Sequence, residues 1–297
     1  MQIGLWIDEF RPLPEVVEAI EKAAAAGFAR AWIGERGGWD PLTVLAAVGD
    51  RAPGIGLGTA VTTTVPRHPL TLAAQALTTQ AAVGNRLTLG IGPSHGPLVE
   101  GRYGLPWDRP GRHVREYVDV LVPVLAGREA EVHGEALTAV GGVTAPGATP
   151  PPLLLAAHGP RMLRLAGARA DGVLTTWTTP RAVGEEVVPA VTTAAAGRPA
   201  PQVVAGVVAS LTADPDGTRS WVAETFAPAD GLPSYRDSVR RQGLGGVADT
   251  VIAGDEGTLE AAVRAFADAG ATELQLIPAG PPADRERTIA FVASLAR

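Results

Sequence analysis

The stretch that decides the fold is a strand–helix–strand unit in the first third of the chain. Residues 55–95 read IGLGTAVTTTVPRHPLTLAAQALTTQAAVGNRLTLGIGPSH. Two short apolar segments, 55–61 and 86–91, enclose an alanine-rich segment at 69–83 that is predicted to be helical. Strands that are apolar on both faces are typical of parallel sheets, in which a helix connects one strand to the next. The unit therefore predicts an α/β fold.

The same alternation of strand and helix continues on both sides of this unit. Eight strands, each followed by a helix, favour a closed (β/α)8 TIM barrel that occupies residues 1–297 as one domain. A doubly wound open sheet is the alternative. The predicted strands are 3–7, 31–34, 55–61, 86–91, 153–157, 172–175, 203–210 and 273–277. The predicted helices are 14–26, 40–50, 69–83, 109–126, 160–170, 180–196, 216–226, 258–269 and 284–296.

Two long insertions interrupt the repeat, one after strand four and one after strand seven. The first contains a hairpin or an irregular stretch, with His133–Gly134 at its turn, and a connector rich in glycine and proline at 141–152. The second, 227–246, has no periodicity that predicts its structure. It includes Tyr235, and it could close over the site, form a surface loop or contact another subunit.

Composition narrows the class of protein. The net charge of −6 gives no reason to expect nucleic acid or an anionic membrane as a partner. The chain has no cysteine, which excludes disulfides and thiolate metal sites, and no other metal-ligand spacing is found. The first ten residues, MQIGLWIDEF, lack the basic and apolar regions of a signal peptide, and no apolar run approaches the roughly 20 residues of a spanning helix. We expect a cytoplasmic protein with a small-molecule substrate.

Polar residues follow several predicted strands, at the rim where barrel chemistry is located. Glu35 follows strand two, and His95 follows strand four. After strand five, residues 157–161 read AHGPR, in which Gly159 permits close approach and Pro160 opens a helix. The free N–H groups at such a helix start, with Arg161 beside them, predict an anion site of the phosphate type, although a plain βα turn is an equally good interpretation of this segment alone.

Glycines inside two predicted strands resemble parts of a dinucleotide fingerprint. Residues 54–58 read GIGLG and residues 90–92 read GIG, but neither has the full spacing before a helix. We interpret them as positions where the barrel wall approaches a flat ring system.

Four segments carry a resemblance to a known family. Residues 55–95, together with 151–177, 194–199 and 232–243, resemble the luciferase-like monooxygenase superfamily and, within it, actinobacterial oxidoreductases that depend on the deazaflavin coenzyme F420. The likeness spans nearly the whole chain. It implies a non-proline cis peptide at the end of strand three, for which the Ala60–Val61 bond is the match.

The resemblance also implies which residues bind the cofactor. One set of residues would lie behind the deazaflavin ring, a second set belongs to the loop after strand four, and a third set matches the phosphate-binding loop. These groups are Ala60, Val61 and Thr62; Gly92, Pro93 and Ser94; and His158, Gly159, Pro160 and Arg161.

The identity of the proton donor does not transfer directly from the family. Some relatives carry a catalytic histidine after strand two, where residues 34–39 of this chain read GERGGW. Hydride transfer to or from a substrate needs a matched proton donor or acceptor. His95 is the candidate for this role, followed by Glu35.

The function implied is that of an F420-dependent oxidoreductase, active on a small organic substrate, in a homodimer. An FMN-dependent monooxygenase and a non-catalytic carrier of flavin or deazaflavin are the alternatives. A groove lined by Arg36, Arg67 and Arg161 would favour F420, because that coenzyme has an anionic tail.

Overall fold

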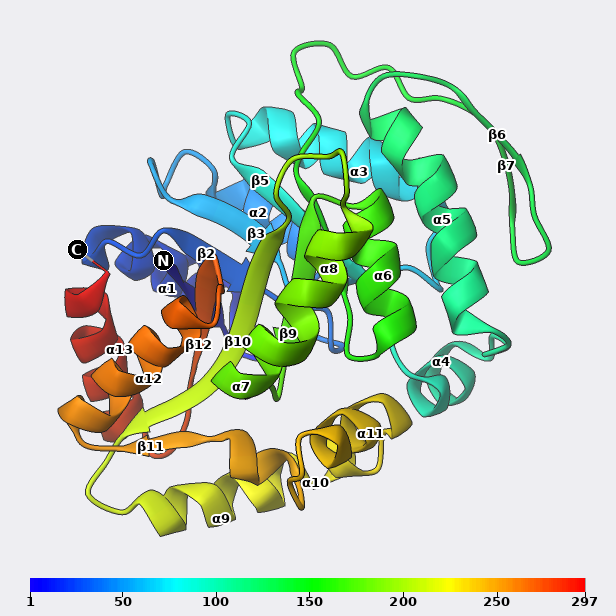
Figure 1. Ribbon diagram of the computed structural model, residues 1–297. Helices are drawn as coiled ribbons and strands as arrows, with labels where there is room; N and C mark the ends of the chain where they lie inside the picture. The colour runs from blue at the N-terminus through cyan, green and yellow to red at the C-terminus, as the bar shows by residue number, and fades with distance from the viewer. Residues whose placement is uncertain (297) are drawn as a thin grey trace.

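The chain folds into a closed barrel of parallel strands (Figure 1). The computed structural model describes residues 1–296, so Arg297, the last residue of the predicted domain, lies outside the described residues. Strand β10 pairs with both β9 and β12, and β12 pairs with β1, which closes the sheet and confirms the (β/α)8 barrel over the open sheet. The barrel strands are β1 (Gln2–Ile7), β2 (Arg30–Ile33), β3 (Gly56–Thr59), β5 (Leu87–Gly92), β8 (Leu153–Ala156), β9 (Gly172–Thr176), β10 (Gln202–Leu211) and β12 (Glu273–Pro278). Two short strands, β4 (Thr62–Thr63) and β11 (Ile252–Gly254), extend the same sheet.

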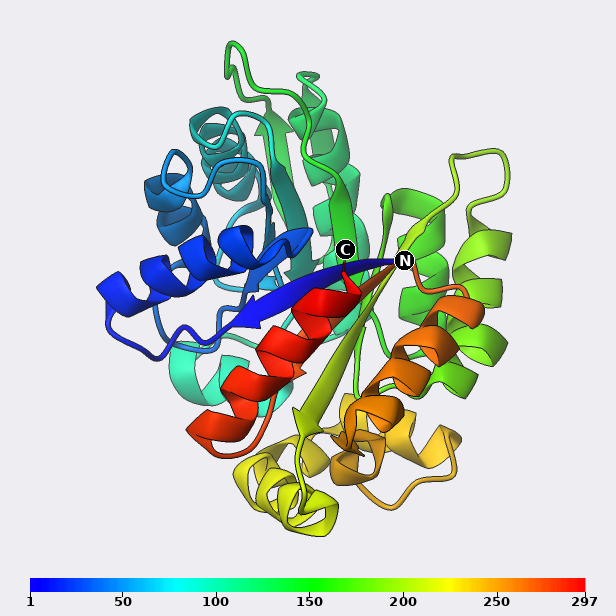
Figure 2. The ribbon, with the colours of Figure 1, turned by 90° about the vertical axis from the view of Figure 1, so that its left-hand side faces the viewer.

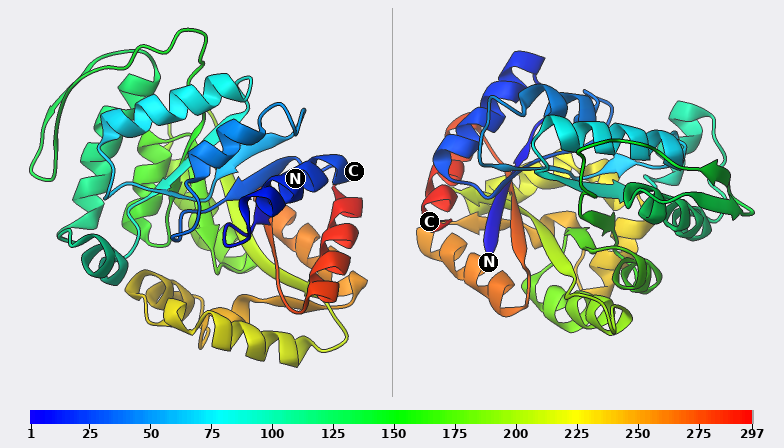
Figure 3. Two further views of the ribbon diagram at one scale, coloured as in Figure 1. Left: turned by 180° about the vertical axis from the view of Figure 1, so that it is seen from behind. Right: turned by 90° about the horizontal axis from the view of Figure 1, so that it is seen from above.

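Helices surround the barrel on the outside (Figure 3). The surrounding helices are α1 (Leu13–Ala26), α2 (Pro41–Val48), α3 (Pro69–Ala82), α5 (Pro110–Leu125), α6 (Pro160–Arg169), α7 (Pro180–Ala182), α8 (Val188–Ala194), α12 (Glu256–Asp268) and α13 (Pro282–Leu295). Local chemistry fixes several ends: the Asp40 side chain accepts the Thr43 N–H at the start of α2, and Gly27 ends α1 at φ +90°. No helix within residues 1–296 is long and apolar enough to cross a membrane.

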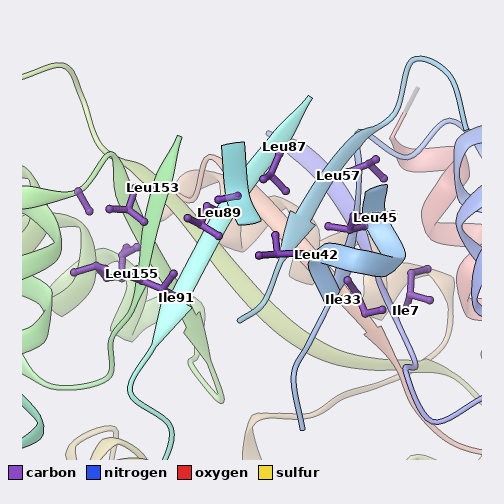
Figure 4. Packing of buried hydrophobic residues seen from close by; sticks show 14 of the residues in the cluster. Ile7, Ile33, Leu42, Leu45, Leu57, Leu87, Leu89, Ile91, Leu153 and Leu155 are labelled. Carbon is purple, nitrogen blue, oxygen red and sulfur yellow. The ribbon is translucent and has the colours of Figure 1, made fainter. Parts of the chain in front are cut away.

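The main core lies between the barrel wall and the helices. Leu57, Leu89 and Leu155 are fully buried on neighbouring strands, and Leu42 and Leu45 of α2 pack in the same cluster (Figure 4). Each such side chain contributes about 1.5–3 kcal/mol when it leaves water. This layer fixes the outward faces of the strands and therefore also decides which residues point into the barrel.

A buried polar network closes the N-terminal end of the barrel interior. Arg30 and Glu273 are the first residues of β2 and β12, and Arg30 Nε donates to Glu273 Oε2 at 3.2 Å. Trp32 Nε1 donates to Glu273 Oε1 at 2.6 Å, and Arg30 Nη1 donates to Thr88 Oγ1 at 2.8 Å. This network therefore fills the N-terminal end of the barrel interior with side chains.

Several predicted elements differ from the structure. The predicted strand 55–61 is divided, because the chain turns after Thr59 and pairs again as β4. The predicted helix 180–196 contains a π-helical turn, η1 (Val183–Val187), between α7 and α8. The segment after β5 holds a helix that was not predicted, α4 (Gly96–Tyr103). The hairpin predicted near His133–Gly134 is present, formed by β6 (Ala130–His133) and β7 (Thr138–Gly141).

The segment after β10 is ordered and mostly helical. It contains α9 (Pro215–Thr225), α10 (Ala227–Asp230), α11 (Pro233–Arg241) and a 3-10 turn, η2 (Val247–Thr250). These helices lie across the end of the barrel toward which β10 points (Figure 2). The insertion at 227–246 therefore covers the C-terminal mouth.

Candidate active site

The C-terminal mouth of the barrel holds a cavity of about 540 Å³. Barrel strands and their loops form its floor, and the segment after β10 forms its roof. A concave, mostly apolar space at this end of a barrel is where small molecules bind. The floor includes Trp6, Ala60, Thr176, Trp177, Val208, Gln275 and Ile277; the roof includes Phe226, Pro228, Ala229, Leu232 and Tyr235; and Arg36, His95, Pro97 and Leu98 lie at the side.

The floor contains the cis peptide that the resemblance implied. The Ala60–Val61 bond is cis, and Ala60 lines the cavity. Both residues pack against the cluster inside the barrel that includes Trp32 and Leu174. Thr62 follows in β4, where its Oγ1 is buried and has no hydrogen-bond partner within residues 1–296. Of the three residues predicted to lie against the ring, Ala60 lines the cavity floor and Thr62 is fully buried.

An aromatic stack joins the roof to two predicted loops. The Tyr235 ring makes edge-on contacts with the rings of His95, at 4.8 Å, and His158, at 4.9 Å between centroids. Ser234 Oγ lies 3.2 Å from His95 Nδ1. Burial lowers the pKa of His95, so its imidazole is neutral at pH 7. Burial raises the pKa of Tyr235, although the nearby Arg36 opposes this shift.

The loop before α6 has the features of the predicted anion site. Gly159 is the N-cap, no side chain caps the helix, and a Cβ on Gly159 would meet nothing within 4 Å. His158 Nδ1 is buried without a hydrogen-bond partner among the described residues. Burial, with smaller contributions from His95 and Arg241, lowers the pKa of His158 to about 3. The open helix start leaves its first N–H groups available to an anion.

Glu35 does not line the cavity, and neither does Arg67. Arg67 Nη1 donates to both oxygens of the Glu35 carboxylate at 2.6 Å, and Arg67 Nη2 donates to Asp40 Oδ2 at 2.6 Å. Glu35 Oε2 also accepts the Thr63 N–H at 2.8 Å. Glu35 therefore acts as a hydrogen-bond acceptor that fixes the start of β4. Of the two proton-donor candidates, only His95 reaches the cavity.

Arg36 is also engaged by carboxylates. Its Nε donates to Glu9 Oε1 at 2.7 Å and its Nη2 donates to Glu9 Oε2 at 3.0 Å. Glu9 is completely buried, and Asp8 lies 3.7 Å from the guanidinium. Arg36 lines the cavity and Arg67 does not, and the guanidinium groups of both residues have carboxylate partners. Asp8 and Glu9 follow β1, and Glu35 and Asp40 follow β2, so these partners come from loops at the same rim as the two arginines.

Comparison with known proteins identifies the family of this chain. The family model described as luciferase-like monooxygenase matches residues 1–295. This chain belongs to that family. The match covers the barrel, both insertions and every residue of the cavity.

Three similar proteins illustrate the range of identity. A Mycobacterium tuberculosis protein named "Putative coenzyme F420-dependent oxidoreductase Rv3520c" is 33% identical over 199 residues, covering 62% of this chain and 56% of that protein. The alignment thus spans little more than half of that relative. The 5,10-methylenetetrahydromethanopterin reductase of Methanolobus tindarius is 28% identical over 261 residues, 86% of this chain and 78% of the reductase. The solved coenzyme F420-dependent tetrahydromethanopterin reductase of Methanopyrus kandleri has a TM-score of 0.78 at 24% identity, covering 98% and 97% of the two chains, and so shares the fold.

Within this family member, one wall residue has an unusual backbone. Trp177 follows β9, is 5% exposed and has φ +58°, a region that bulky side chains rarely adopt. Gln242 Nε2 donates to its carbonyl oxygen at 2.9 Å, while Gln242 Oε1 accepts the Thr179 N–H at 2.8 Å. The Trp177 ring packs on Phe226 of the roof at 5.2 Å. The rim position of Trp177 could be predicted from the sequence, but its conformation and the role of Gln242 could not.

The strand glycines pack against the barrel's own side chains. A Cβ on Gly58 would overlap the Trp32 ring, and one on Gly90 would overlap the Thr59 carbonyl oxygen and Leu174 Cδ1. The expectation that these two positions face a bound ring is therefore wrong, because protein atoms already fill the space. Gly92 is different: a Cβ there would lie 3.0 Å from Val61 Cγ2, so Gly92 leaves room for the cis segment.

Proposed function

We propose that this protein is an F420-dependent oxidoreductase that transfers a hydride between the deazaflavin and a small organic substrate. One observation carries the proposal: a single cavity is lined both by Ala60 of the cis segment and by His95, a group able to move a proton. The luciferase-like family and the F420-dependent relatives support the same chemistry.

The residues present fit a phosphorylated flavin-type cofactor. Ala60, Val61 and Thr62 would lie against the ring, and the buried Thr62 Oγ1 without a partner offers it a hydrogen bond. The loop of Gly92, Pro93 and Ser94 would flank it, with Ser94 at φ +70°. His158, Gly159, Pro160 and Arg161 would hold the phosphate at the uncapped start of α6. When bound, the deazaflavin supplies the carbon that accepts or releases the hydride.

His95 is the group that moves the substrate proton. Its lowered pKa leaves the imidazole unprotonated at neutral pH. It can therefore accept the proton of a substrate hydroxyl as the substrate is oxidised. Ser234 engages Nδ1, which leaves Nε2 for the substrate. The roof excludes water from this exchange, since Phe226, Leu232 and Tyr235 cover the mouth. Oxidation should accelerate as pH rises through the His95 pKa, and reduction should slow.

The first experiment is a parallel titration of the purified protein with F420 and with FMN. Trp6 and Trp177 line the cavity, so quenching of tryptophan fluorescence reports binding there. Tight F420 binding and weak FMN binding are expected. His95→Gln should keep F420 affinity and lower turnover by about 10²–10⁴-fold. His133→Gln, in the exposed β6–β7 hairpin, is the matched control and should leave turnover unchanged. Binding of neither cofactor, or full turnover in His95→Gln, would contradict the proposal.

One observation favours an FMN-dependent monooxygenase as the second candidate. The carboxylates of Glu9, Glu35 and Asp40 neutralise Arg36 and Arg67, so these two arginines offer little to the anionic tail of F420. FMN has only a phosphate, which the start of α6 could hold alone. The reverse titration result, with FMN tight and F420 weak, would establish this candidate instead.

A further inference from the structure

Helix α11 of the roof contacts the loops that hold the proposed cofactor residues. Near its start, Ser234 Oγ lies 3.2 Å from His95 Nδ1. The Tyr235 ring contacts the rings of His95 and His158. At the other end of the helix, Arg241 Nη2 donates to the carbonyl oxygen of His158. Helix α11 therefore joins the loop after β5 to the loop after β8.

The contact of Arg241 brings a cation to the start of α6. His158 directly precedes Gly159, the N-cap of α6, so Arg241 binds the peptide group that leads into this helix. No side chain caps the helix, and its first N–H groups together with the helix dipole favour an anion. A guanidinium on the adjacent peptide group adds a positive charge and further N–H donors.

Arg241 keeps donors that its protein contacts do not use. Its Nε lies 3.5 Å from Glu186 Oε2, and within residues 1–296 no protein atom accepts a hydrogen bond from Nη1. The Arg241 and Glu186 side chains are 35% and 41% exposed, so solvent weakens the attraction between them. The planar fork of a guanidinium matches the oxygens of a phosphate. The side chain is therefore held at the helix start with donors left for an anion.

We propose that Arg241 of the roof binds the cofactor phosphate together with the start of α6, so that the phosphate fastens the roof to the barrel. This inference rests on the proposed function. Arg36 and Arg67 differ from Arg241, because carboxylates lie within 2.7 Å and 2.6 Å of their guanidinium groups. Leu232 and Tyr235, which line the cavity, belong to the same segment as Arg241. A phosphate that fixes α11 therefore also fixes the cover over the cavity.

The test separates the phosphate from the ring system. FMN and riboflavin differ only in the phosphate, and F420 and its deazaflavin core without the phosphate-bearing tail form a second pair. Each compound is titrated against the whole chain, and quenching of tryptophan fluorescence reports binding. Arg241→Gln should weaken the phosphate-bearing member of the pair that binds by about tenfold and leave the phosphate-free member unchanged. Arg241→Lys keeps the charge without the planar fork and should recover part of the loss.

Arg240→Gln is the matched control, because Arg240 is exposed on the same helix and its substitution should change neither member of a pair. Equal losses for both members in Arg241→Gln would mean that the residue acts only through the fold of the roof. That result would overturn the inference, and so would unchanged binding of both members.

Hydrogen exchange of the α11 amides gives a readout that needs no ring system. Inorganic phosphate, added at constant ionic strength, should slow this exchange in the wild type and not in Arg241→Gln. If neither pair of cofactors binds but phosphate protects α11 in this way, the proposed function falls and the phosphate site of Arg241 is supported. If neither pair binds and phosphate leaves the exchange unchanged, the inference falls as well.

Discussion

Because Trp177 has a left-handed backbone conformation, we predict that Trp177→Gly is more stable than Trp177→Ala, which is the reverse of the usual order. At most positions glycine is less stable than alanine by about 0.5–1 kcal/mol, because glycine loses more backbone freedom on folding. At φ +58° the order should reverse, since any residue with a Cβ in this left-handed region is strained by about 1–2 kcal/mol. Trp177→Gly relieves that strain and Trp177→Ala keeps it.

The difference in the free energy of unfolding between the two variants depends on the backbone at residue 177, because their other losses are the same. Both lose the indole, which is 5% exposed and packs on Phe226, at a cost of about 3–5 kcal/mol. Both keep the hydrogen bond from Gln242 to the carbonyl of residue 177. After the entropy of glycine is subtracted from the relieved strain, Trp177→Gly should be more stable than Trp177→Ala by about 1 kcal/mol.

Urea unfolding followed by circular dichroism measures this difference. Trp221 provides the control pair, because it is part-exposed in helix α9, where alanine should be the more stable substitution by about 1 kcal/mol. If Trp177→Ala proves as stable as Trp177→Gly, while the Trp221 pair behaves normally, the backbone at 177 is not strained and the reasoning fails.

Three further predictions concern the support of the site. Gln242→Ala should lower the free energy of unfolding by about 2–4 kcal/mol, because the buried hydrogen bonds of the Gln242 amide group to the Thr179 N–H and the Trp177 carbonyl are lost. Urea titration would measure this change. Gly90→Ala should destabilise by about 1–3 kcal/mol through overpacking, whereas Gly101→Ala, with open space around it, should be neutral or stabilising in a thermal melt. His158 has a pKa of about 3 when folded and an ordinary value of 6.5, so the unfolded chain binds more protons between these values and stability falls as pH drops through that window. His158→Gln should lose less stability than the parent between pH 7 and pH 5.

The barrel could be predicted because its strands carry strong local signals. Strands such as β5 and β8 are apolar on both faces and lie between glycine or proline segments, so their positions follow from sequence alone. After β10, helix α9 was predicted as 216–226, but residues 227–246 lacked such signals. Helices α10 and α11 are only 4 and 9 residues long, and neither has a side-chain N-cap. Proline lies near each start, and α11 has Arg240 and Arg241 in its last turn, but these signs are weak over such short helices.

The candidate site likewise has features that the sequence predicts and contacts that it does not. The rim position of His95 and the cis bond at Ala60 follow from strand order and from the resemblance, because both lie at a strand end. The pairing of Arg36 with Glu9 joins residues 27 apart, and the contact of Ser234 with His95 joins residues 139 apart. Such contacts depend on how loops of different strands meet at one rim, and this is decided by tertiary packing.

The two halves of the cavity therefore have different origins, and this bears on substrate choice. Strand register and the packed interior fix the floor, so the residues proposed to bind the cofactor there can change little without disturbing the barrel. The roof rests on short helices anchored through Gln242 and through edge-on contacts of Tyr235 with two histidines. Substitutions in the roof can change the shape of the cavity at small cost to the barrel. We therefore expect substitutions at Leu232 to alter the choice of substrate, and substitutions at Ala60 to alter the binding of the cofactor.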